Sequence, residues 1–118
     1  MELAPTGDGI DLAVVLRFVD IATDALADAR EEIDALNVYP VPDGDTGTNM
    51  YLTVSAARDA IAEAMALVPA QSPGETLDDS ARDAALTAFA RGALLGARGN
   101  SGVILSEMLG ALARRIAA

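Results

Sequence analysis

Two stretches of the chain are rich in glycine and in side chains that carry oxygen, and both could bind ions. The first runs from Asn37 to Met50 and reads Asn-Val-Tyr-Pro-Val-Pro-Asp-Gly-Asp-Thr-Gly-Thr-Asn-Met. Asp43 and Asp45 are separated by one glycine, so a curved backbone can turn both carboxylates toward one point, and such hard oxygen ligands suit Mg²⁺. A helix is predicted to begin directly afterwards, and a helix N-terminus favours phosphate. The stretch therefore predicts a loop that binds a metal ion and a phosphate.

The same residues also fit a simple turn followed by a helix cap, because Asp-Gly is common in turns. Thr46, Thr48 and Asn49 favour the binding function, since a plain connector needs no such hydroxyl and amide groups. Pro40 and Pro42 forbid a continuous helix and stiffen the approach to the loop. Both interpretations stay open at this point, with ligand binding the more specific one.

The second stretch runs from Gly96 to Gly102 and reads Gly-Ala-Arg-Gly-Asn-Ser-Gly. It can be interpreted as a helix end with Gly99 as the residue after the helix and Ser101 as the next N-cap. It can also be an anion cradle, in which glycines let the backbone approach a phosphate and Asn100 and Ser101 add donors. The usual P-loop motif is absent, and because the chain contains no Lys it could not be completed. Any phosphate site here is therefore of a different kind.

The amino-acid composition of the chain excludes several classes of protein function. The chain has 118 residues, 52% of them hydrophobic but only 3% aromatic, which predicts one domain of closely packed helices. A formal net charge of −10 argues against a nucleic-acid partner or an anionic membrane. The absence of Cys and His excludes disulfides, thiolate zinc sites and Ser-His triads. No apolar run reaches membrane-spanning length and no signal peptide is evident, so we expect a cytoplasmic protein without membrane insertion.

Apolar residues recur every three or four positions in four segments and predict an all-α fold. The predicted helices cover residues 10–36, 48–68 and 77–97, with a fourth from Gly102 to the chain end. Thr46 or Thr48 is the expected cap of the second helix. Alanines and Gly92 in the third helix would allow a neighbouring helix to approach closely. The fourth helix is apolar over much of its circumference, so we expect it to be central to the fold.

One face of the first predicted helix is acidic, and we expect most of it to be solvated. Asp34 is the best candidate on that face for a ligand or partner, because it lies close to the Asn37–Met50 stretch.

Both stretches together resemble a known family. The sequence Pro-Val-Pro-Asp-Gly-Asp-Thr-Gly-Thr-Asn-Met at 40–50, with Ala-Arg-Gly-Asn-Ser-Gly-Val-Ile-Leu-Ser at 97–106, is similar to the ATP-binding L domain (DhaL) of the dihydroxyacetone kinase superfamily. Within this superfamily, the two motifs are most similar to those of the N-terminal domain of bacterial fatty acid kinase. In glycerone kinases the first motif usually reads Gly-Asp-Gly-Asp-His-Gly, and Thr46 stands in the His place here. The resemblance extends from about residue 10 to the end of the chain.

The resemblance implies an antiparallel all-α helical barrel or bundle that binds ATP and two Mg²⁺ ions at one end. The family's metal carboxylates fall on Asp43 and Asp45. A further upstream Asp has no counterpart, because Val38 stands five places before Asp43, and Asn37 is the nearest candidate oxygen ligand. The family's contacts to the nucleotide phosphates fall on Thr46, Gly47, Thr48, Asn49, Asn100, Ser101 and Gly102. No covalent nucleophile is implied.

The acceptor that the resemblance implies is a fatty acid presented by a separate lipid-binding carrier protein. One alternative is a glycerone kinase subunit, although the family holds dihydroxyacetone through a His in a separate subunit and this chain contains none. Another is a non-catalytic helical interaction module. The family domain has more helices than the four predicted here, so we expect residues 1–118 to be a single, truncated domain. Such a domain would expose an apolar face, which could support a homodimer.

Overall fold

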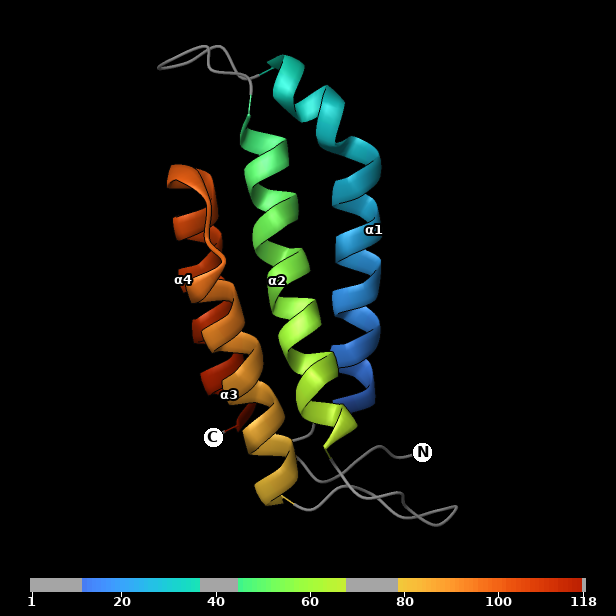
Figure 1. The fold of residues 1–118 in the computed structure, drawn as a ribbon, viewed down its shortest axis with the longest axis vertical. Coiled ribbons are helices and arrows are strands. Elements are labelled where there is room, and N and C mark those ends of the chain that lie inside the picture. The colour runs from blue at the N-terminus through green and yellow to red at the C-terminus, as the bar shows by residue number, and fades with distance from the viewer. Residues whose placement is uncertain (1–11, 37–44, 68–78, 118) are drawn as a thin grey trace.

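The computed structural model describes residues 12–36, 45–67 and 79–117, and these ranges are almost entirely helical (Figure 1). The helices are α1 (Leu12–Leu36), α2 (Thr46–Ala66), α3 (Asp79–Leu95) and α4 (Gly99–Ala117). Over the described ranges there is no strand. The all-α prediction is therefore confirmed, and the first three helices agree with their predicted ranges to within about two residues, the usual uncertainty of a helix end.

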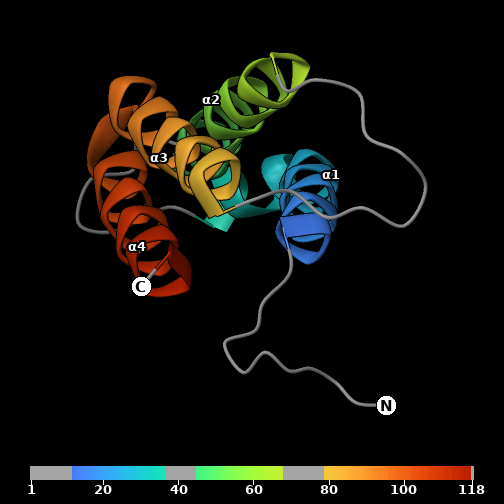
Figure 2. The ribbon, with the colours of Figure 1, turned by 90° about the horizontal axis from the view of Figure 1, so that it is seen from below.

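The helices run alternately up and down, so sequence neighbours are antiparallel (Figure 1). As a result, α2 and α4 run in the same direction, and both begin at the end of the bundle where α1 and α3 finish. Among the described elements α2 packs against all three others. Viewed along the bundle, α1 and α4 lie on either side of the pair formed by α2 and α3 (Figure 2).

The core is built from small and aliphatic side chains supplied by all four helices. In α2 and α3 it includes Ile61, Leu86 and Phe89, each at most 2% exposed. Burial of such side chains stabilises a fold by about 1.5–3 kcal/mol each. The other buried apolar residues are Leu12, Val15, Val19, Val54, Ala57, Ala85, Ala93, Leu109 and Ala113.

Small residues bring α2 and α3 very close together. A Cβ atom at Gly92 would collide with the Cβ of Ala60 and would lie 3.1 Å from the carbonyl oxygen of Ala56. One turn further on, a Cβ at Gly96 would collide with the Cβ of Ala56. The predicted close approach of a neighbouring helix to Gly92 is thus confirmed, and that neighbour is α2.

The prediction that the fourth helix would be central is wrong, because α2 takes that place. One side of α4 packs on α3 and α2 through Leu109 and Ala113, while its other side is exposed. A groove of about 270 Å³ between α1, α3 and α4 is lined entirely by apolar side chains, including Phe18, Phe89 and Ile116. The predicted exposed apolar face of α4 is confirmed, and its members are Val103, Ile104, Met108 and Leu112. None of the four described helices has both the length and the hydropathy of a membrane span.

Candidate functional site

The first turn of α2 begins with the predicted metal and phosphate residues. Asp45 occupies the N-cap position with φ −128° and ψ 13°, and its side chain is exposed and makes no capping hydrogen bond. Its carbonyl oxygen accepts a bond of 2.8 Å from the Asn49 N–H. Thr46 is the first helical residue. The prediction that Thr46 or Thr48 would be the cap is therefore wrong, because the helix begins two residues earlier than its apolar stripe suggests.

The side chain that caps α2 comes from α1. One oxygen of the Asp34 carboxylate accepts the N–H of Thr48 at 3.1 Å, and the other accepts its hydroxyl at 2.6 Å. An anion at this point is favoured by the free N–H groups and the positive end of the helix dipole. Asp34 therefore performs, from a neighbouring helix, the task that an N-cap side chain usually performs.

These hydrogen bonds also change the acidity of Asp34. The Thr48 hydroxyl is the main cause that lowers the pKa of Asp34 below its ordinary value, while partial desolvation acts in the opposite direction. The N–H groups of Thr48 and Gly47 and the positive charge of Arg30 also lower the pKa. The rest of the acidic face of α1 is exposed as predicted, with Asp20, Asp24, Asp28 and Glu31 in solvent.

Gly47 is buried where the start of α2 crosses the end of α1. A Cβ atom at this position would lie 2.5 Å from the carbonyl oxygen of Arg30 and 2.9 Å from the Cβ of Ile33. The first neighbour is backbone and cannot move aside easily, so only glycine fits. The contact brings Thr48 within reach of Asp34.

The second predicted stretch opens α4. The helix begins at Gly99 rather than at Gly102, so Asn100, Ser101 and Gly102 all lie in its first turn. Ser101 is consequently not an N-cap, and Gly99 is not the residue after α3, which ends at Leu95. Gly99 has φ 67°, in the left-handed region that favours glycine. Asn100 is exposed and Ser101 is half-buried.

The structure brings the two stretches together. A Cβ atom at Gly99 would collide with the side-chain amide of Asn49, and one at Gly102 would lie 2.5 Å from Oγ1 of Thr53. The N–H of Arg98 donates to that same Thr53 oxygen at 3.3 Å. The glycines of the second stretch therefore let its backbone rest directly on the start of α2.

This contact places two helix N-termini beside each other at one end of the bundle, since α2 and α4 run in the same direction (Figure 1). The first N–H groups of a helix have no intrahelical acceptor. In α2 the N–H groups nearest Asp34 are already engaged by its carboxylate. In α4 the Gly102 N–H donates to the Arg98 carbonyl at 3.1 Å, so the earlier amides of Asn100 and Ser101 have no acceptor within the helix.

The structure describes only some of the predicted metal ligands. Asp43 and Asn37 lie outside the described residues, whereas Asp45 is described and exposed at the start of α2. Within the described ranges no three acidic side chains gather into a metal site. The carboxylate of Asp45 is not used for capping, so its oxygens suit a hard cation such as Mg²⁺.

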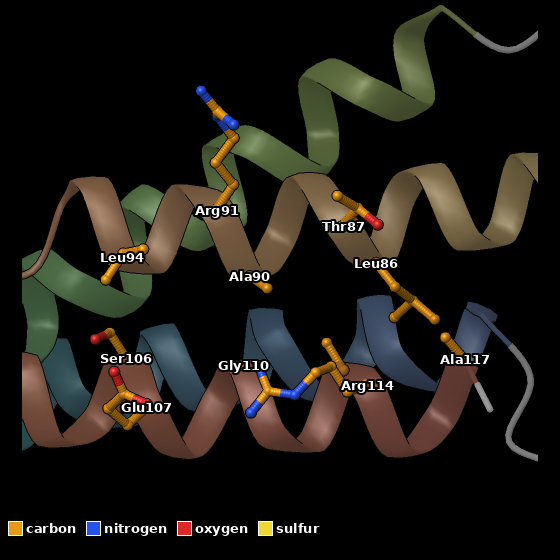
Figure 3. A pocket seen from close by; sticks show the side chains of 11 residues that line it. Leu86, Thr87, Ala90, Arg91, Leu94, Ser106, Glu107, Gly110, Arg114 and Ala117 are labelled. Atoms are coloured by element: carbon orange, nitrogen blue, oxygen red, sulfur yellow. The ribbon is translucent and has the colours of Figure 1, made fainter.

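A separate groove of about 380 Å³ lies between α3 and α4 (Figure 3). Its lining includes Leu86, Ala90 and Ala113 and a few polar groups. Figure 3 shows Arg114 extending along the groove toward Gly110, whereas Arg91 points away from α4. None of the residues predicted to contact a nucleotide lines this groove.

A comparison with known protein families matches residues 40–118 to the DAK2 domain. The chain belongs to the DAK2 domain family. This family is related to kinases and binds nucleotides, and its domains generally act with partner subunits. The match confirms the predicted superfamily, while the closer likeness to fatty acid kinase stays a prediction.

Curated relatives extend well beyond this chain. An uncharacterized protein of Staphylococcus haemolyticus is 43% identical over 91 residues, which are 77% of this chain and 14% of that protein. One of Staphylococcus saprophyticus is 46% identical over 83 residues, 70% of this chain and 13% of the relative. An uncharacterized protein of Staphylococcus aureus is 41% identical over 91 residues, which are 77% of this chain and 14% of that protein. The chain therefore spans 13–14% of the length of these relatives.

Sequence reasoning missed one residue of this site. Thr53 lies beside Val54 on the buried face of α2, four positions after Asn49, and a polar residue on an apolar face was the available signal. Asp34 was predicted to contact a ligand or partner rather than to cap α2, because the pattern of α1 does not show which helix start lies opposite it.

Proposed function

We propose that this chain is the ATP- and Mg²⁺-binding part of a kinase whose acceptor is a fatty acid presented by a separate lipid-binding protein. The observation that carries the proposal is the contact between the two predicted stretches, which sets the N-termini of α2 and α4 beside each other. Membership of a nucleotide-binding family supports the same conclusion.

The two helix starts would have different tasks. The start of α4 would receive the phosphates, because the amides of Asn100 and Ser101 have no acceptor within the helix and their side chains add donors. The start of α2 already holds the Asp34 carboxylate, so Thr48 would help mainly by fixing the backbone around Asp45. We therefore expect phosphate contacts from Thr46 and Asn49 to be secondary to those from α4.

Asp45, with Asp43 and Asn37, would hold the metal ions. Bound Mg²⁺ supplies positive charge that neutralises the triphosphate during transfer. The protein's own contribution is to hold the γ-phosphate in line with an oxygen of the acyl carboxylate. That oxygen forms the new bond to phosphorus, the bond to the bridging oxygen breaks, and ADP leaves with the electron pair. No covalent intermediate with the protein is needed.

The nucleotide part of the proposal is tested by calorimetric titration of Mg·ATP into the wild-type chain and two variants. Asp45→Asn keeps the size of the side chain but removes a metal carboxylate, and affinity should fall by at least about tenfold, as expected when a metal site is weakened. Asp59→Asn makes the same charge change at an exposed position further along α2 and should bind like wild type. Equal affinities for both variants, or no binding by wild type, would contradict the assignment.

The acceptor is tested separately. Phosphorylation of a carboxylate yields an acyl phosphate, which hydroxylamine traps as a hydroxamate. The chain should form hydroxamate from Mg·ATP and a carrier loaded with fatty acid. Phosphate transfer to dihydroxyacetone, with none to the fatty acid, would instead support the alternative that the chain is a glycerone kinase subunit. Tight Mg·ATP binding with no transfer to either acceptor would limit the activity of this chain to nucleotide binding.

A further inference from the structure

Thr53 lies beneath the contact between the two predicted stretches. It belongs to the second turn of α2 and is 0% exposed. A hydroxyl buried this completely is costly unless it is hydrogen-bonded. Thr53 is satisfied twice, because its Oγ1 donates to the carbonyl oxygen of Asn49 at 2.8 Å and accepts the N–H of Arg98 at 3.3 Å.

These two bonds connect parts of the chain that are 45 residues apart. Asn49 belongs to the first turn of α2, and Arg98 belongs to the connection between α3 and α4. A hydroxyl is needed for both bonds, since one atom must act as donor and acceptor together. Valine has the same shape as threonine but would leave the Arg98 N–H without this acceptor, whereas serine keeps the hydroxyl.

Packing reinforces the connection on both sides of Thr53. Gly102 lies against its Oγ1 so closely that an added Cβ would be 2.5 Å away. Gly99 lies against the side chain of Asn49 in the same way. The first turn of α4 is therefore seated on the turn of α2 that runs from Asn49 to Thr53.

We propose that Thr53 is a positioning residue that holds the start of α2 and the start of α4 as one rigid unit. The rigid coupling follows from the contacts of Thr53 alone. Its consequence for nucleotide affinity rests on the proposed function, because the phosphates would be gripped by α4 while the metal is held beside α2. Without the hydroxyl, the hydrogen bond to Arg98 would be lost and these two parts of the site would be held together less rigidly.

The chain contains a matched control. Thr23 in α1 is also buried, at 2% exposed, and its Oγ1 donates to the carbonyl oxygen of Val19 at 2.7 Å. That bond stays within one helix turn and joins no second segment. Thr23→Val and Thr53→Val therefore delete the same hydroxyl from similar surroundings, but only the second deletion cuts the connection to Arg98.

The experiment combines amide hydrogen exchange with Mg·ATP titration on wild type, Thr53→Val, Thr53→Ser and Thr23→Val. Thr53→Val should speed exchange of the Arg98 amide by about tenfold, the equivalent of one ordinary hydrogen bond, and should weaken Mg·ATP binding to a similar extent. Thr53→Ser should restore both properties. Thr23→Val should change neither.

Unchanged exchange at Arg98 in Thr53→Val, relative to Thr23→Val, would overturn the coupling. If Thr53→Val does not fold, the wild-type protein still decides the matter, because the Arg98 amide should be protected although it lies between two helices. Exchange of that amide at the rate of a free peptide would overturn the proposal. Failure of wild type to bind Mg·ATP would instead refute the proposed function, and the exchange result would then judge the coupling on its own.

Discussion

Replacing Gly92 with alanine tests the close packing of α2 and α3, on which the position of the candidate site depends. An added Cβ would collide with the Cβ of Ala60 and would lie 3.1 Å from the Ala56 carbonyl oxygen. Gly110 in α4 offers a matched comparison, since the nearest atom to its added Cβ is Nη1 of Arg114 at 3.4 Å, the far end of a flexible side chain. The same substitution should therefore stabilise the protein at Gly110 but not at Gly92.

The magnitudes follow from two opposing effects. Alanine is better than glycine in a helix interior by about 1 kcal/mol, and this gain applies at both positions. At Gly92 it is opposed by overpacking, which costs about 1–3 kcal/mol because the contact includes backbone. We expect Gly110→Ala to be stabilising by about 1 kcal/mol and Gly92→Ala to be neutral to destabilising by about 2 kcal/mol.

Thermal and urea unfolding followed by circular dichroism will measure both variants. A difference of 1 kcal/mol should move the unfolding midpoint by about 4 °C in a domain of this size. Adding Ala60→Gly to Gly92→Ala removes the colliding methyl, so a double-mutant cycle should show a favourable coupling of at least about 0.5 kcal/mol. If Gly92→Ala raises the midpoint as much as Gly110→Ala does, the close approach of α2 and α3 is refuted.

Two further predictions concern Asp34 and the core. The pKa of Asp34 is lowered below its ordinary value of 3.8 in the folded state, so its contribution is present above that value and is lost as pH falls through the lowered pKa. We expect the free energy of unfolding, measured with urea between pH 6 and pH 2, to fall less with decreasing pH in Asp34→Asn than in wild type. The fall for Thr48→Val should be intermediate. Identical pH profiles for the three proteins would contradict the capping role of Asp34. Ile61→Ala, at a side chain 1% exposed, should cost about 2–5 kcal/mol in the same assay, whereas Leu67→Ala, at 85% exposed, should stay within about 0.5 kcal/mol.

The sequence was sufficient to predict the four helices, because each has an apolar stripe and each of the three stretches between them contains proline or glycine. The start of α4 was placed too late for a physical reason. Glycine, asparagine and serine are typical of loops, but the contact of Arg98 with Thr53 and of Gly99 with Asn49 lets the helix begin at Gly99. The loop propensity of these residues is overridden by contacts with α2, and a local sequence pattern cannot indicate such contacts.

The prediction that α4 would be the central helix was wrong for a different reason. An apolar circumference shows that a helix could be buried, but not that neighbours are available to bury it. In this structure Ile104 and Met108 are more than 60% exposed, while α2, with its small residues Ala56 and Ala60, contacts every other helix. The size of side chains on the facing surfaces decided which helix is central, rather than total hydrophobicity.

The meeting of the two predicted stretches can be traced to the same small residues. Each stretch precedes a helix, and because the helices alternate in direction, α2 and α4 must begin at the same end of the bundle. Direction alone does not place those two starts in contact. Gly92 and Gly96 do so, since they let α3 approach α2 until the connection after α3 can reach Thr53. A larger residue at either glycine should therefore separate the two halves of the candidate site before it unfolds the bundle.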